Sequence, residues 1–180
     1  IKVNKKASKY LAIVGTTSEW LNNAIRENGV FHFPPNRKPR INVLSKGDLC
    51  LIYLYDKKAF AGEFRVIETK EITAEEFHKK YAVRAYEVPK APFPKPGDVV
   101  RIIIYDVLRS YARLIPADKI ENIKSVGPLG FFRLLKWERY QWLHHKIRQV
   151  TKGSINSTQK LDLCKVEKAV DELSKETIED

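Results

Sequence analysis

The sequence predicts an α+β domain in which about six short strands form a small curved sheet or barrel, flanked by a few helices. Short apolar runs rich in β-branched and aromatic residues recur between turn-forming stretches, at 10–15, 49–55, 60–68, 83–88 and 99–105. Helical spacing of apolar residues is confined to a few separate segments. Because 43% of the 180 residues are hydrophobic, one such domain can bury a real core.

The N-terminal part of the domain begins with a strand and a capped helix. The apolar run at 10–14 is typical of a buried strand. Thr17 or Ser18 can cap a helix over 19–28. Gly29 is expected to end that helix as its C′ residue.

An aromatic corner, Phe31-His32-Phe33, follows this helix. The next segment, 34–40 with the sequence PPNRKPR, cannot continue a regular element because its prolines fix φ and remove hydrogen-bond donors. We therefore expect a loop in which the cations of Arg37, Lys38 and Arg40 gather beside the aromatic corner.

Two similar turns each precede an apolar strand. The turn at 45–48 leads into the strand at 49–55, and the turn at 95–98 leads into the strand at 99–105. Residues 59–68 are the expected hairpin partner of the first of these strands. The shared turn chemistry explains the similarity without a duplication.

The segment between these strands contains a second helix. Thr73 with Glu76 three residues later matches a capping box, which predicts a short helix ending at Lys80. A strand is expected at 83–88. Four prolines within 89–96 then predict a stiff crossing loop.

The remainder of the sequence, from residue 108 onward, contains one ambiguous segment and then mostly helical patterns. Residues 108–114 fit either a strand or an irregular segment, and 116–121 fit a single helical turn. An amphipathic helix is expected over 134–150, then a polar linker at 151–160 and a separate helix at 161–174. The predicted organisation is thus a flexible basic arm at 1–8, one domain at 9–150, and a linker with a helix at 151–180 that leads towards a further domain or partner.

The net charge of +11 is concentrated in the predicted domain. Residues 151–180 hold 5 lysines and 7 acidic residues, so residues 1–150, with 28 basic and 15 acidic side chains, carry +13. A domain this basic attracts polyanions without sequence preference. A lysine-rich surface of the thermophile type gives the same count.

Targeting and membrane segments are absent from the pattern. The first eight residues are polar and basic with no apolar segment after them, and no apolar run approaches the roughly 18 residues that a membrane span needs. We therefore expect a cytoplasmic protein with no membrane partner.

The sequence contains no familiar catalytic or metal-binding motif. Cys50 and Cys164 are too far apart for a metal-ligand spacing or a disulfide framework, and His144 and His145 lack further ligands at zinc-type spacing. Phosphate-binding loops, nucleophile elbows and metalloprotease motifs are also missing. The prediction is a non-catalytic binding domain with no cofactor, no metal and no catalytic residue; an enzyme with an unfamiliar site is the alternative.

The order and spacing of several short motifs resemble the EVE domains of the PUA-like superfamily, which are relatives of the YTH readers of methylated adenine. The resemblance covers roughly residues 9–148 and is carried by Tyr10, Trp20, Val30-Phe31, Lys46-Gly47-Asp48, Ile52-Tyr53, Gly62-Glu63-Phe64-Arg65-Val66 and the glycine-rich stretch from Gly127 to Arg133. The chain departs from the family at Phe31, where tryptophan is frequent, and over 89–104. The resemblance implies a curved β-barrel with a pocket for a flipped, modified base.

The resemblance also implies the site residues. The pocket would lie between the end of the first strand, the aromatic corner and the loop after the third strand, lined by Gly15, Thr16, Trp20, Phe31, Phe33, Asn36, Phe77 and Tyr81. Arg37, Lys38, Arg40 and Arg133 would hold the flanking phosphates. Each has a plain structural alternative: the rings and His32 can pack in the core, Asn36 can form a turn, and the cations can be surface charges.

The predicted function is recognition of a flipped methylated adenine or cytosine in DNA. The segment after 150 is similar to the linkers that follow the N-terminal readers of McrB-type subunits in modification-dependent restriction systems, so a further domain is expected beyond residue 180. A reader of modified single-stranded RNA, and a protein-interaction module that docks through 161–174, are the alternatives.

Overall fold

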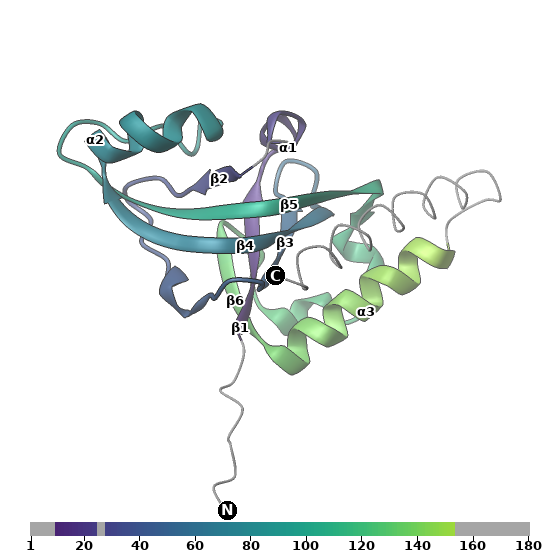
Figure 1. Cartoon of the computed structure of the whole chain (residues 1–180). Coiled ribbons are helices and arrows are strands. Elements are labelled where there is room, and N and C mark those ends of the chain that lie inside the picture. Colours follow the sequence, from purple (N-terminus) through teal and green to yellow (C-terminus); the bar gives the residue numbers. More distant parts are fainter. Residues whose placement is uncertain (1–9, 25–27, 154–180) are drawn as a thin grey trace, which may run out of the picture.

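The computed structural model describes residues 10–24 and 28–153 (Figure 1). The predicted arm at 1–8 and the predicted helix at 161–174 lie outside the described residues. The strands are β1 (Tyr10–Thr16), β2 (Gly29–His32), β3 (Leu49–Leu54), β4 (Ala59–Thr73), β5 (Val99–Pro116) and β6 (Phe132–Lys136). The helices are α1 (Ser18–Asn23), α2 (Ala74–Glu76) and α3 (Trp137–Gly153), with short helical turns η1 (Ile41–Val43), η2 (Phe77–Tyr81), η3 (Ala82–Arg84), η4 (Ala117–Lys119) and η5 (Ile123–Val126).

The six strands form one sheet in the order β2-β5-β4-β3-β1-β6. β1 and β3 are parallel and all other neighbours are antiparallel. The long strands β4 and β5 curve across the molecule (Figure 1), and three register shifts along this pair permit the bend. The sheet curls until its two ends meet: Phe33, directly after β2, packs edge-on against Phe132 of β6 with ring centroids 5.4 Å apart.

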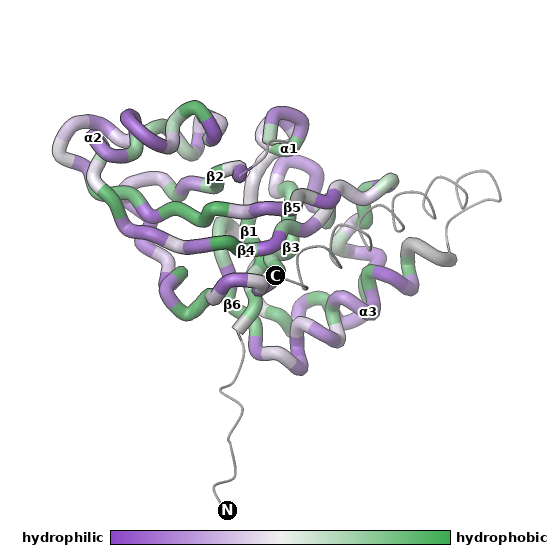
Figure 2. The backbone as a smooth tube through the Cα atoms, in the orientation of Figure 1, coloured by the Kyte–Doolittle hydropathy of each residue, from purple (hydrophilic) through white to green (hydrophobic). Residues whose placement is uncertain are grey.

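The curled sheet separates two large apolar layers. Its concave side holds a cluster of rings, including Trp20, Phe31, Phe64 and Tyr105. Its other face packs against α3, whose Leu143 and Ile147 are fully buried. Figure 2 shows apolar segments along the central strands and mixed polarity along α3. None of the described helices is long and apolar enough to cross a membrane.

Two predicted helix starts are confirmed. Thr17 accepts a hydrogen bond from the Trp20 N–H at 3.2 Å and begins α1, and Thr73 accepts one from the Glu76 N–H at 3.2 Å and begins α2. The single helical turn expected near 116–121 is present as η4.

The strand predicted at 83–88 is wrong. The helical segment that begins with α2 continues through η2 and η3, and residues beyond it make only an isolated bridge between Val88 and Ala91. Residues 83 and 84 continue the helical segment as part of η3, and Pro89, directly after the predicted strand, cannot donate to a ladder.

The boundaries of four elements also differ from the prediction. α1 ends at Asn23, so Gly29 is not its C′ residue; Gly29 begins β2, where an added Cβ would lie 2.2 Å from the Tyr105 ring. β4 extends to Thr73, and β5 includes the ambiguous segment 108–114 as a strand. The start predicted for the last helix, 134, lies in β6, and α3 extends three residues beyond the predicted end at 150.

Candidate nucleic-acid interface

A narrow cavity lies at the end of β1, inside the curled end of the sheet. Its volume is about 10 Å³, roughly the room that one water molecule requires. Five of the eight predicted pocket residues line it: Gly15, Thr16, Trp20, Phe31 and Phe33. The other lining residues are His32, Pro34, Tyr55, Val88, Ala91 and Phe131.

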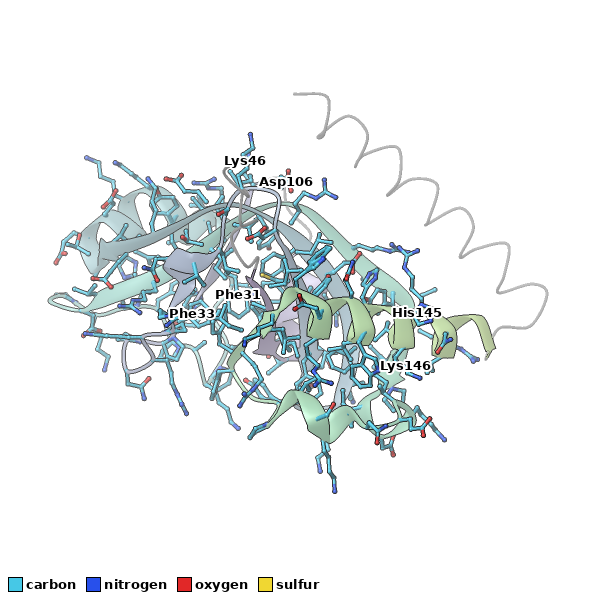
Figure 3. All side chains as sticks on the ribbon, turned by 90° about the horizontal axis from the view of Figure 1, so that it is seen from below. Phe31, Phe33, Lys46, Asp106, His145 and Lys146 are labelled. Carbon is cyan, nitrogen blue, oxygen red and sulfur yellow. The ribbon has the colours of Figure 1, made fainter. Side chains whose placement is uncertain are left out.

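Three buried rings form the inner wall of this cavity. Phe31 packs edge-on against Trp20 at 5.2 Å and against Phe33 at 5.1 Å between ring centroids. All three are at most 5% exposed, and Figure 3 shows Phe31 and Phe33 close together within the body of the fold. This wall is rigid and apolar because the rings are also part of the hydrophobic core.

Two half-buried rings, Tyr55 and Phe131, form the opening of the cavity. Their centroids lie 5.6 Å apart at an angle of 60°. The sequence prediction missed both residues. Tyr55 follows a strand that ends in a turn, and Phe131 follows a glycine-rich loop, so each occupied a position at which an exposed ring could have been suspected.

The loop that carries Phe131 is docked on Gly15. The Gly15 N–H donates to the Phe131 carbonyl at 2.8 Å, so this N–H already has a protein partner. An added Cβ at Gly15 would lie 1.8 Å from the Gly130 carbonyl oxygen. Gly15 therefore permits close approach of two backbones, whereas the predicted role was contact with a base edge.

A cation lies over each ring of the opening. The Arg37 guanidinium carbon is 4.9 Å from the Phe131 centroid, and the Lys90 ammonium is 4.9 Å from the Tyr55 centroid. Among the described residues, neither cation has a carboxylate partner within ion-pair distance. We call Tyr55, Phe131, Arg37 and Lys90 the cavity mouth.

An open groove of about 540 Å³ adjoins the cavity and shares Phe33 and Phe131 with it. Asn36, Arg37 and Lys38 lie along this groove with exposed side chains. Three of the predicted ligand-contacting residues therefore lie together here, next to the cavity but outside it.

Both loops that carry these cations are braced by buried or half-buried side chains. Arg101 donates from Nη1 to the carbonyls of Lys38 and Pro39 and from Nε to Glu71 at 2.8 Å. His32 donates from Nε2 to the Ala91 carbonyl at 2.8 Å, beside Lys90. Burial lowers the pKa of His32, which favours the neutral form of the ring that braces this loop.

Four predicted site residues lie elsewhere. Phe77 and Tyr81 belong to a separate apolar cluster with Val30 and Ile102, because α2 and η2 pack against residues of β2, β4 and β5 away from the cavity. Arg133 donates to the Pro128 carbonyl at 3.1 Å and so braces the glycine-rich loop. Arg40 is exposed and lines neither the cavity nor the groove.

A second polar site lies on the opposite face of the sheet, under α3. Glu63 of β4 contacts three groups: Arg109 Nη1 at 3.7 Å, the Tyr111 hydroxyl at 3.4 Å and His144 Nε2 at 3.1 Å. We call these four residues the Glu63 cluster. Burial opposes ionisation of Glu63, but the His144 hydrogen bond and charge, with the charges of Arg109 and Arg148, outweigh it and lower the pKa of Glu63. Within residues 10–24 and 28–153, no three potential metal ligands gather.

The fold matches solved structures of low sequence identity. No protein-family model matches the sequence, and no curated protein matches it. The ASCH protein from Zymomonas mobilis is similar to this chain with a TM-score of 0.58 and 14% sequence identity, and the match covers 74% of this chain and 93% of that protein. A single-residue mutant of the same protein matches with a TM-score of 0.59 and 14% identity, covering 77% of this chain and 96% of the mutant. The N-terminal domain of Staphylothermus marinus McrB gives a TM-score of 0.48 and 13% identity, covering 77% and 94%. The ASCH structures establish the fold, which is PUA-like and confirms the predicted fold class.

Proposed function

We propose that this domain binds a flipped-out modified base, a methylated adenine or cytosine, in DNA. The observation that carries the proposal is the cavity mouth: an aromatic-walled cavity opens between two rings, and each ring has over it a cation that no described carboxylate pairs. Aromatic faces beside positive charge suit a ligand that combines a flat base with an anionic backbone. The net charge of +13 over residues 1–150 attracts that backbone from a distance.

The cavity must open to admit a base, since it has room for about one water molecule. Opening separates Tyr55 from Phe131 and moves Arg37 or Lys90 off its ring. Each exposed cation–ring contact contributes about 0.5–1 kcal/mol. A base that stacks on such a ring returns about 1–3 kcal/mol, and the displaced cation becomes available to a phosphate. Insertion therefore replaces weak internal contacts with stronger contacts to the ligand.

The buried inner wall is suited to detect a methyl group. Burying one methyl contributes only about 0.8 kcal/mol by transfer, so a preference of tenfold or more also requires correct pairing of the base's polar atoms. The rigid rings of Trp20, Phe31 and Phe33 limit the depth and width available to the base. A wall that cannot yield discriminates by shape more strongly than a flexible one.

The proposal extends to the context that the sequence resemblance suggested. An EVE-type reader with a connector after residue 150 suits the specificity module of a modification-dependent restriction system, with a further domain as its partner. The domain itself would act by binding. Its most enzyme-like pair of side chains, Glu63 of β4 and His144 of α3, lies between the sheet and α3, on the other face of the sheet from the cavity.

Binding to matched duplexes tests the proposal. One duplex is unmodified, one carries methylated cytosine and one carries adenine methylated on its exocyclic amine, all at one near-physiological salt concentration. A preference of tenfold or more for one modified duplex is expected. A modified single-stranded RNA is included, and tighter binding to it would replace DNA with RNA as the ligand. Equal affinities with a steep salt dependence would refute recognition of a modified base.

A further inference from the structure

The two cations of the cavity mouth are presented by two similar turns. In the first, the Arg37 N–H donates to the Pro34 carbonyl at 2.8 Å; in the second, the Ala91 N–H donates to the Val88 carbonyl at 2.9 Å. Pro34 lines the cavity at the base of the first turn, and Val88 and Ala91 line it at the base of the second. Each turn thus contributes apolar wall inside and one cation outside.

Each of the two cations lies over a different ring of the same opening. Arg37 lies over Phe131 and Lys90 lies over Tyr55, and these two rings are neighbours at 5.6 Å. A nucleotide inside a strand has a phosphate on each side of its sugar. If its base enters between the two rings, the strand runs away from the opening in two directions, with one phosphate on each side of the base. The protein supplies one cation near each of these exits.

We propose that Arg37 and Lys90 bind the two phosphodiesters that flank the everted nucleotide, so that the ligand is an internal nucleotide of a strand. Lys90 is thereby a phosphate-binding residue at the Pro-rich turn. The inference rests on the proposed function and adds the class of ligand: a modified nucleotide with a phosphodiester on both sides.

The bracing of the two turns supports this role. Arg101 fixes the carbonyls of Lys38 and Pro39 directly after Arg37, and His32 fixes the Ala91 carbonyl directly after Lys90. Cations on braced turns lose less conformational freedom on binding than cations on free loops. The braces therefore position two charges that no described carboxylate neutralises.

Neutral backbone linkages test the inference directly. Methylphosphonate replaces the phosphodiester on the 5′ side, on the 3′ side, or on neither side of the modified nucleotide in the preferred duplex. The wild-type domain should lose affinity at both positions, by about 3- to 10-fold for each lost phosphate contact. Lys90→Ala should be insensitive to one neutral linkage and Arg37→Ala to the other.

The salt dependence provides a second readout. Each variant should lower the slope of log affinity against log salt by about 0.9, the value for one phosphate contact. Lys95→Ala is the matched control, because it removes an exposed lysine from the same Pro-rich segment without touching the mouth. It should keep the wild-type slope and both sensitivities.

The outcomes separate this inference from the proposed function. If no modified duplex is preferred by the wild-type domain, both fall. If a modified duplex is preferred but Lys90→Ala behaves like Lys95→Ala, the proposed function stands and the paired phosphate contacts are refuted. Sensitivity of Lys90→Ala to both neutral linkages would also refute the pairing.

Discussion

The cavity mouth and the Glu63 cluster both combine charged and aromatic side chains, but the two regions differ in whether the charges are paired within the protein. In the Glu63 cluster a buried carboxylate is surrounded by Arg109, Tyr111 and His144, so its charge is satisfied within the protein. At the mouth, two cations lie on ring faces with no described carboxylate within ion-pair distance. A satisfied polar cluster holds the fold together, whereas cations without anionic partners remain available to an anionic ligand. The comparison distinguishes stability from binding, and single substitutions can test each side separately.

The largest effect is expected from Glu63→Gln. The substitution preserves volume but removes the buried carboxylate that Arg109, Tyr111 and His144 contact, and removing one member of a buried ion pair costs about 3–5 kcal/mol. Urea unfolding should show this loss of stability, while the folded variant keeps wild-type affinity for nucleic acid. Glu68→Gln is the control, because Glu68 contacts Lys70 at 3.8 Å on the surface and its loss should leave the unfolding midpoint unchanged. If the folded Glu63→Gln domain lost affinity for the duplex, the Glu63 cluster would contribute to binding as well as to stability, which would contradict the distinction between the two regions.

The second effect concerns the contact that positions the mouth. Gly15→Ala places a methyl group on the Gly130 carbonyl and must push the loop with Phe131 outward. Overpacking of this kind costs about 1–3 kcal/mol of stability, and the displaced ring should also weaken duplex binding. Gly130→Ala is the matched control, since an added Cβ there meets no atom within 4 Å and the residue does not have a left-handed φ. Thermal unfolding and duplex titration of both variants would show whether the contact matters; equal behaviour would contradict the close approach.

The third effect tests the mouth alone. Phe131→Ala removes a half-buried ring, so stability should change little, while the lost stacking should lower affinity for the modified duplex about tenfold, or about 1.4 kcal/mol. Trp137→Ala removes a ring of α3 that is 40% exposed and lies on the Glu63 side of the fold. Its affinity should match the wild-type value in the same titration. Equal losses in both variants would mean that any exposed ring contributes and that the mouth is not special.

The same division explains how much the sequence could predict. Strands that contain their own apolar pattern and turns, such as β1 and β3, were predicted closely, and both threonine caps were confirmed. β2 and β6 were missed because each is only four or five residues long and is stabilised by distant partners, β5 and β1. The residues at 83–88 have strand-forming side chains, but the first two of them continue the helical segment of η2 and η3. Local pattern cannot show which distant partners will stabilise a segment.

The candidate site was predictable to the same extent. The inner wall comes from residues near one another in sequence, 15–33, so motif order was enough to find it. The opening combines Tyr55, Lys90 and Phe131 from three distant segments. Pairing of β3 and β6 with β1 brings Tyr55 and Phe131 together, and Lys90 reaches Tyr55 from the loop after η3. Phe77 and Tyr81 are predicted in the wall because they are aromatic, yet both belong to another apolar cluster, and Phe77 reaches the cavity only through the back of His32.

The smallest effect is the pH dependence of the Glu63 cluster. A carboxylate whose pKa is lowered in the folded state contributes stability above its ordinary value of 4.5, and this contribution is lost as pH falls through the lowered pKa. The pH-dependent part is the net of opposed influences, because burial, the largest influence on Glu63, opposes ionisation while the hydrogen bond and charge of His144 and the charges of Arg109 and Arg148 favour it. The difference in unfolding free energy between wild type and Glu63→Gln should therefore narrow from about pH 6 to about pH 3. If the difference in unfolding free energy stays constant over that range, Glu63 acts through packing and neutral hydrogen bonds. The Glu63 cluster and the cavity mouth would then differ only in how deeply their side chains are buried.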